Sequence, residues 1–115
     1  MKTTLLRLSL LVLPALLAAC SPSSTVDSAE PVKGVAALAQ SKSCLGCHAM
    51  DRKVVGPSFK DVAAKYAGDL GAEARLAAKI RKGGSGVWGP VPMPGNGQIS
   101  EAEAKQLAEW VLSQK

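Results

Sequence analysis

Apolar residues recur every three or four positions in four stretches of this chain, which is the spacing of one face of an α-helix. The first stretch, residues 31–41, starts with Pro31, and proline is favoured in the first turn of a helix. In the second stretch, Ser58 and Asp61 have the spacing of a capping box. The apolar face behind this start consists of Phe59, Val62, Ala63 and Tyr66.

The third stretch, residues 71–84, places Leu76 and Ile80 one helical turn apart and ends in two glycines, which commonly stop a helix. The fourth begins with a second capping-box pair, Ser100 and Glu103. Its apolar face consists of Ala104, Leu107, Ala108 and Val111. No stretch alternates with the period of two that marks a strand. The sequence therefore predicts an all-α domain of about four short helices without internal repeats.

One segment, residues 83–99, shows neither period. Six of its 17 residues are glycine and three are proline, so we expect a loop. Loops of this length are uncommon in compact domains unless they carry function. Near the centre of the segment, Met93 lies between Pro92 and Pro94, which restrict the backbone and lack an N–H group.

The N-terminal residues 1–19 have the pattern of a secretory signal peptide, in which Lys2 and Arg7 precede a short apolar run. The run ends in LAAC, at Cys20, and resembles the lipobox of bacterial lipoproteins, where the cysteine is lipidated and becomes the first mature residue. The alternative is ordinary cleavage followed by an incidental cysteine. Leu17 argues against it, because such a site prefers a small residue there.

Residues 20–31 follow as the lipidated cysteine and a tether that contains almost no large apolar side chain. The folded domain is then expected to span residues 32–115. Without the signal peptide, 12 basic and 9 acidic side chains remain, and they form no basic run. This mild excess gives nucleic-acid binding little support. With only four aromatic residues, a domain this small also needs more than its own side chains to fill a core.

Two cysteines and the only histidine of the chain lie together in the run Cys44-Leu45-Gly46-Cys47-His48. This C-x-x-C-H spacing is typical of c-type haem attachment, because the two thiols can reach the two vinyl groups of one haem and the histidine can bind the iron. A zinc site would need four ligands, and a thioredoxin-like pair would need a βαβ setting. We therefore expect one covalent haem c, which would also fill the centre of the domain.

Met93 is the candidate for the second axial ligand. Methionine and histidine together are the ligand pair of electron-transfer cytochromes, in which the thioether raises the reduction potential. The flanking prolines lessen the entropy lost in placing the sulfur, and the nearby glycines let the backbone approach the porphyrin. Met50 lies two residues from His48 and so belongs to the proximal side. The alternative is that Met93 only fills space in the core, as methionines often do. That role would not explain why its loop is so long.

Three stretches, CLGCHAMDRKVVGPSFKDVAAKYAG, GVWGPVPMPGN and LAEWVLSQK, resemble class I c-type cytochromes from about Lys42 to Lys115. Within that class the chain is most similar to the short bacterial type that donates electrons to nitrite reductase and terminal oxidases. The resemblance implies that the carbonyl of Pro57 accepts a hydrogen bond from His48 Nδ1. It also implies that Trp88 donates its indole N–H to a haem propionate.

Further roles follow from the same resemblance. Asn96 is expected to form a hydrogen bond with the Met93 sulfur, and Lys79 or Arg81 to neutralise a propionate. Trp110 is expected in the core between the first and last helices. Members of this family usually place an aromatic residue on the first helix against the last one, whereas this chain offers Val35, Leu38 and alanines there.

These observations predict a one-electron carrier rather than an enzyme, with both axial ligands kept on the iron so that little has to reorganise. The resemblance implies a quinol-oxidising cytochrome complex as donor and nitrite reductase or a terminal oxidase as acceptor. Lys42, Lys53 and Lys82 are candidates for steering the carrier toward acidic partners. A peroxidase-like site or a gas-sensing haem module is the alternative, and it would need Met93 to leave the iron accessible.

We expect a monomer on the periplasmic side of a bacterial membrane, held there by the lipid on Cys20. Ser21, rather than an aspartate, follows this cysteine and favours the outer membrane over the inner one. A soluble periplasmic protein is the alternative.

Overall fold

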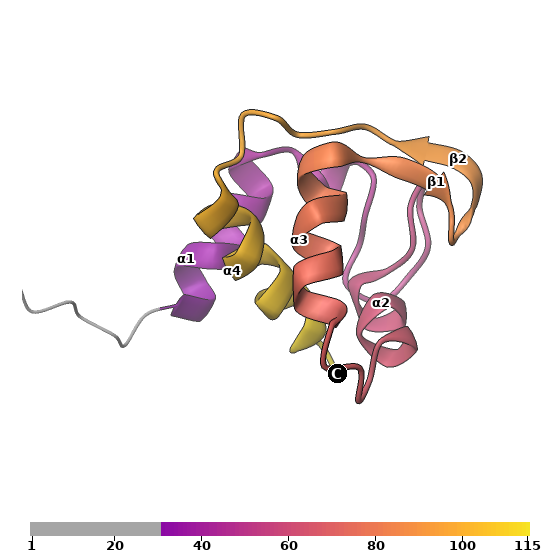
Figure 1. Cartoon of the computed structure of the whole chain (residues 1–115), viewed down its shortest axis with the longest axis horizontal. Helices are drawn as coiled ribbons and strands as arrows, with labels where there is room; N and C mark the ends of the chain where they lie inside the picture. The colour runs from indigo at the N-terminus through magenta and orange to yellow at the C-terminus, as the bar shows by residue number, and fades with distance from the viewer. Residues whose placement is uncertain (1–30) are drawn as a thin grey trace, which may run out of the picture.

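The computed structural model describes residues 31–115, with side chains from residue 34 onward. The predicted signal peptide, Cys20 and most of the predicted tether lie outside these residues. The elements follow in the order α1 (Pro31–Ser41), the 3-10 helix η1 (Cys44–Gly46), α2 (Phe59–Lys65), α3 (Ala72–Lys82), β1 (Gly84–Gly86), β2 (Gly89–Met93) and α4 (Glu101–Leu112) (Figure 1). The described residues form four short α-helices, so the predicted helical fold is confirmed. None of the described helices has the length and apolar character needed to cross a bilayer.

The two predicted capping boxes, at the starts of α2 and α4, are built on serine side chains. In α4 the box is complete, because Glu103 N–H donates to Ser100 Oγ (3.1 Å) and Ser100 N–H donates to Glu103 Oε2 (2.8 Å). In α2 one half is present, the bond from Asp61 N–H to Ser58 Oγ (3.0 Å). Helix α3 ends at Gly83, whose φ of 72° lies in the region that favours glycine.

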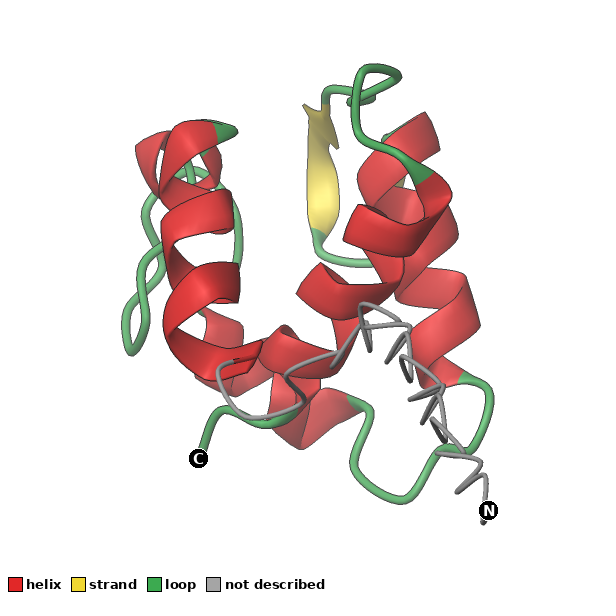
Figure 2. Ribbon diagram, turned by 90° about the vertical axis from the view of Figure 1, so that its left-hand side faces the viewer, coloured by secondary structure: helices red, strands yellow, loops and turns green. Residues whose placement is uncertain are grey.

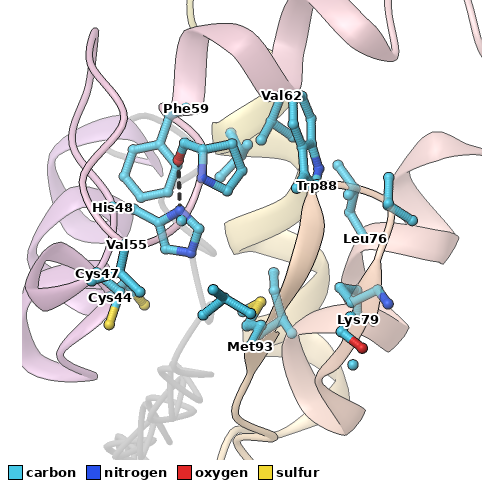
Figure 3. A pocket seen from close by; sticks show the side chains of 18 of the residues that line it. Cys44, Cys47, His48, Val55, Phe59, Val62, Leu76, Lys79, Trp88 and Met93 are labelled. Carbon is cyan, nitrogen blue, oxygen red and sulfur yellow. Dashed lines mark hydrogen bonds between the residues drawn. The ribbon is translucent and has the colours of Figure 1, made fainter.

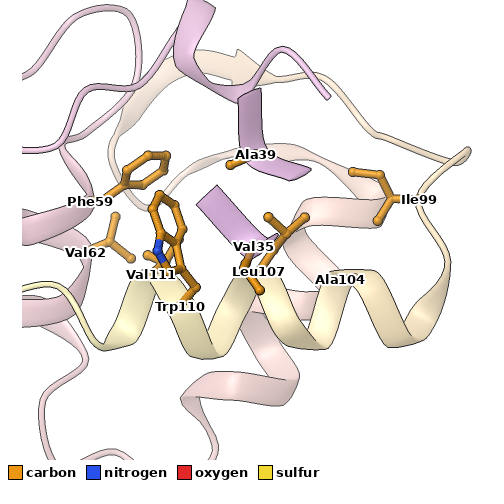
Figure 4. Packing of buried hydrophobic residues seen from close by; sticks show 9 residues of the cluster. All are labelled: Val35, Ala39, Phe59, Val62, Ile99, Ala104, Leu107, Trp110 and Val111. Carbon is orange, nitrogen blue, oxygen red and sulfur yellow. The ribbon is translucent and has the colours of Figure 1, made fainter. Parts of the chain in front are cut away.

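Helix α4 lies at the centre of the core, and its buried face meets the other helices (Figure 4). Helix α1 packs against it through Val35 and Ala39, so this contact is aliphatic. Trp110 is buried in the core as expected, but its aromatic neighbour is Phe59 of α2 rather than a residue of α1. The two rings meet edge to face, with centroids 5.1 Å apart.

The segment predicted to be a loop without strands contains a hairpin, and in this respect the prediction was wrong. Strands β1 and β2 pair antiparallel, with Gly84 opposite Met93, Gly86 opposite Gly89 and an irregular register between them. Figure 2 shows how small a part of the domain they form. Three of the four paired residues are glycines with positive φ, so the hairpin leaves no alternating apolar pattern in the sequence.

Replacing Leu107 with alanine should lower the free energy of unfolding by about 2–5 kcal/mol, because it opens a cavity in the buried face of α4. The measurement is denaturant unfolding of the purified protein. Leu70→Ala is the matched control, since Leu70 is fully exposed and its loss should change stability by less than about 0.5 kcal/mol. Equal effects of the two substitutions would contradict the assigned core.

Candidate functional site

A large, mainly apolar pocket opens between the chain around η1, helices α2 and α3, and the hairpin (Figure 3). Residues far apart in the sequence line it together, among them Cys44, Cys47, His48 and Met93. Met50, the competing methionine, is exposed and does not line this pocket. The structure therefore brings both predicted thiols, the imidazole and one of the two candidate thioethers to the same space.

The two cysteines are held by the tight turn of η1, in which the N–H groups of Cys47 and His48 both donate to the carbonyl of Cys44 (3.2 and 3.0 Å). The two cysteines form no disulfide with each other, and Cys44 is half-buried while Cys47 is exposed. Burial raises the pKa of the Cys44 thiol, and a backbone hydrogen bond acts more weakly in the opposite direction. The turn thus presents two thiols and the following imidazole on one wall of the pocket.

His48 is oriented by the segment that folds back over this turn. The N–H groups of Val55 and Gly56 donate to the carbonyl of Cys47 (3.2 and 2.8 Å), which brings the next residue, Pro57, over the imidazole. Its carbonyl lies 2.7 Å from His48 Nδ1. Because a carbonyl can only accept, Nδ1 carries the proton, and in the neutral imidazole Nε2 then keeps its lone pair. In Figure 3 the ring extends into the pocket from the side of the two cysteines.

Two further residues confine the same ring. A Cβ on Gly56 would lie 2.8 Å from His48 Nδ1 and 2.9 Å from Nε2, closer than such atoms ever approach. The ring of Phe59 stacks on the imidazole with centroids 5.4 Å apart and planes 18° from parallel. Neither role was identified from the sequence. In the sequence, Gly56 directly precedes Pro57, whose carbonyl faces the imidazole. A side chain at position 56 would therefore displace the ring.

Met93 is held on the opposite side of the pocket by the end of α3. A Cβ on Gly83 would lie 2.6 Å from the amide nitrogen of Gly95, and one on Gly95 would lie 3.0 Å from the carbonyl oxygen of Lys82. The backbone that follows Met93 therefore packs directly on the backbone of α3. Glycine at both positions is what permits this approach.

Asn96 differs from its expected role. Its backbone N–H and its side-chain Nδ2 both donate to the carbonyl of Ile80 (3.2 and 3.1 Å), and Nδ2 also lies 3.4 Å from the carbonyl of Pro94. Among the hydrogen bonds of residues 34–115 there is none from Asn96 to the sulfur of Met93. The amide faces the last turn of α3, because that turn offers a carbonyl without a helical partner.

The lysine and arginine residues considered for a propionate or an acidic partner differ in their position relative to the pocket. Lys79 and Lys53 line the pocket, whereas Arg81 donates its Nε to the carbonyl of Ile99 (3.2 Å) and is not a lining residue. Lys42 forms an ion pair with Glu103 (3.7 Å) outside the lining, and Lys82 is exposed at the end of α3. Of the two residues expected near a propionate, Lys79 is therefore the better placed.

Trp88 lies in the turn of the hairpin and lines the pocket, with 40% of its surface exposed. The Nζ of Lys65, at the end of α2, lies 5.3 Å from the centre of its ring. This contact joins the hairpin to α2, and nothing in the sequence pattern pointed to it.

Replacing Gly56 with alanine should push the imidazole of His48 away from the carbonyl of Pro57. We expect the Nδ1 proton of this single histidine to shift in a nitrogen–proton NMR spectrum, together with a loss of stability of about 1–3 kcal/mol. Gly97→Ala is the control, because nothing lies within 4 Å of a Cβ there. An unchanged His48 resonance in Gly56→Ala would contradict the close approach.

The donor set of this pocket fits haem. Two thiols can form thioethers, an imidazole with a free Nε2 and a methionine sulfur can bind iron from opposite sides, and the apolar lining suits a porphyrin.

Comparisons with known proteins agree with this chemistry. Residues 32–115 match the family model described as cytochrome c. Over 78 residues the chain is 60% identical to cytochrome c-551 of Pseudomonas aeruginosa, covering 68% of this chain and 74% of that protein. It is 58% identical to cytochrome c-552 of Hydrogenobacter thermophilus over 78 residues, or 68% of this chain and 79% of that one.

A solved structure shows the same likeness. The crystal structure of wild-type Nitrosomonas europaea cytochrome c552 superimposes with a TM-score of 0.68 at 52% identity, covering 70% of this chain and 99% of that one. The chain thus belongs to the cytochrome c family, and it is a one-electron carrier with covalently attached haem c rather than an enzyme.

Proposed function

We propose that Cys44 and Cys47 hold the haem through thioether bonds, with the iron bound between His48 and Met93. The observation that supports this assignment is that these four side chains, from two distant parts of the sequence, line one apolar pocket. The thiols and the imidazole lie on one wall and the methionine on another (Figure 3).

When bound, haem supplies the ferric–ferrous couple. The chain supplies two ligands that need not move when the oxidation state changes. His48 is held by the carbonyl of Pro57 and by the ring of Phe59. Met93 is held by two adjacent prolines and by the packing of its backbone on α3. Little reorganisation is needed, which favours rapid one-electron transfer.

The same residues set the reduction potential. The hydrogen bond to Pro57 makes His48 a more basic ligand, while the thioether of Met93 favours the ferrous state. Lys79 lies in the lining, where its charge would offset that of a propionate, and Trp88 offers an indole N–H for the same group. Burial in the apolar pocket raises the cost of the additional positive charge of the ferric form.

Partners and location are part of the same proposal. From the resemblance of the sequence, the donor is a quinol-oxidising cytochrome complex and the acceptor is nitrite reductase or a terminal oxidase. Lys53, at the pocket, offers charge for an acidic partner. We place the monomer on the periplasmic side of the membrane, with residues 1–19 removed and the domain of residues 32–115 tethered by lipidated Cys20.

Replacing Met93 with alanine should leave haem attached, because Cys44, Cys47 and His48 remain. The ferric protein should lose the weak long-wavelength band of sulfur-to-iron ligation, the potential should fall, and carbon monoxide should bind the ferrous form. Absorption spectra, potentiometry and carbon monoxide titration measure these changes.

Met50→Ala is the matched control and should alter none of the three, because Met50 is exposed outside the pocket. A band that persists in Met93→Ala, with carbon monoxide still excluded, would show that Met93 is not the ligand. Carbon monoxide binding by the unmodified protein would favour a gas-sensing or peroxidase-like module instead.

Replacing Cys20 with alanine should release the cytochrome from the membrane, because it removes the site of lipidation. Fractionation of cells should then move haem c from the membrane to the soluble periplasmic fraction. If the unmodified protein is already found in the soluble fraction, the anchor proposal is wrong and the protein diffuses freely.

A further inference from the structure

The hairpin, residues 84–93, lines the pocket along its whole length, with Trp88 in its turn and Met93 at the end of β2. Its Met93 end packs on the end of α3, where Gly83 and Gly95 meet backbone against backbone. Its turn lies at the other end. An isolated two-stranded hairpin is marginally stable in water, and most residues of this one are exposed.

The contact of this turn with α2 comes from Lys65. Its Nζ lies 5.3 Å from the centre of the Trp88 ring, within the range of a cation–π interaction. The ion pairs found among residues 34–115 do not include Lys65, so no carboxylate there competes with the ring for its ammonium group.

Helix α2 thus contacts both sides of the pocket. Phe59, at its first residue, stacks on His48, and Lys65, at its last, lies over Trp88. In Figure 3, Trp88 is drawn across the space from Phe59 and His48. A displacement of the hairpin relative to α2 therefore changes the separation of the His48 side from the Met93 side.

We infer that Lys65 is a positioning residue, which acts through Trp88 to hold the hairpin, and with it Met93, in the arrangement that favours ligation. This inference rests on the proposed function, since it takes Met93 to be the ligand. A weaker hairpin contact would leave Met93 bound but raise the fraction of molecules in which an added ligand can replace it.

Lys65→Gln should therefore bind added imidazole more tightly in the ferric state, by about two- to fivefold, which is the change expected from an exposed cation–π contact. Lys65→Arg should match the unmodified protein, because a guanidinium also stacks on an aromatic face. Lys60→Gln is the matched control, since it removes the same charge from the same helix, whereas the cation–π contact with Trp88 is made by Lys65. The indole N–H resonance of Trp88 should shift in Lys65→Gln and stay in place in Lys60→Gln.

A double-mutant cycle separates the contact from a general charge effect. In a Trp88→Leu background, Lys65→Gln should have no further effect on imidazole affinity. The inference is overturned if Lys65→Gln leaves the imidazole affinity unchanged in the otherwise unmodified protein. It is also overturned if Lys65→Gln changes that affinity equally with and without Trp88. Absence of the sulfur–iron band from the unmodified protein would be a different result, because it would overturn the ligand assignment as well.

Discussion

The hydrogen bond from His48 Nδ1 to the carbonyl of Pro57, 2.7 Å long, is the constraint on which the rest of the site depends. It selects the tautomer that leaves Nε2 free for iron, and it sets the direction in which that lone pair points. The bond exists because Val55 and Gly56 turn the chain back on the carbonyl of Cys47, within the haem-binding motif. The absence of a side chain at Gly56 gives the ring the space that this turn requires.

The core and the site are one packing unit, because they share the ring of Phe59. One face of this ring stacks on His48, and the edge-to-face contact with Trp110 continues into the buried face of α4. A substitution that shifts α4 therefore reaches the imidazole through two aromatic contacts. The core of so small a domain has few other large side chains. The stability of the domain and the orientation of His48 therefore cannot be varied independently.

Sequence reasoning identified what depends on periodicity and on local motifs. The helical fold, the serine caps and the grouping of Cys44, Cys47 and His48 all follow from spacings within a few residues. It missed the hairpin, since three of the four paired residues are glycines and leave no side-chain pattern. It also missed the contact of Lys65 with Trp88 and the orientation of Asn96 toward Ile80, because each joins segments whose proximity only the folded chain establishes.

The two sides of the pocket are held in different ways. His48 is held within a short continuous stretch, by the carbonyl of Pro57 and the ring of Phe59, so its position is determined locally. Met93 depends on contacts distant in sequence, with α3 on one side and with α2 by way of the hairpin turn on the other. Because those contacts can loosen without breaking the core, the methionine side is the one through which surface residues can adjust ligation while the histidine stays fixed.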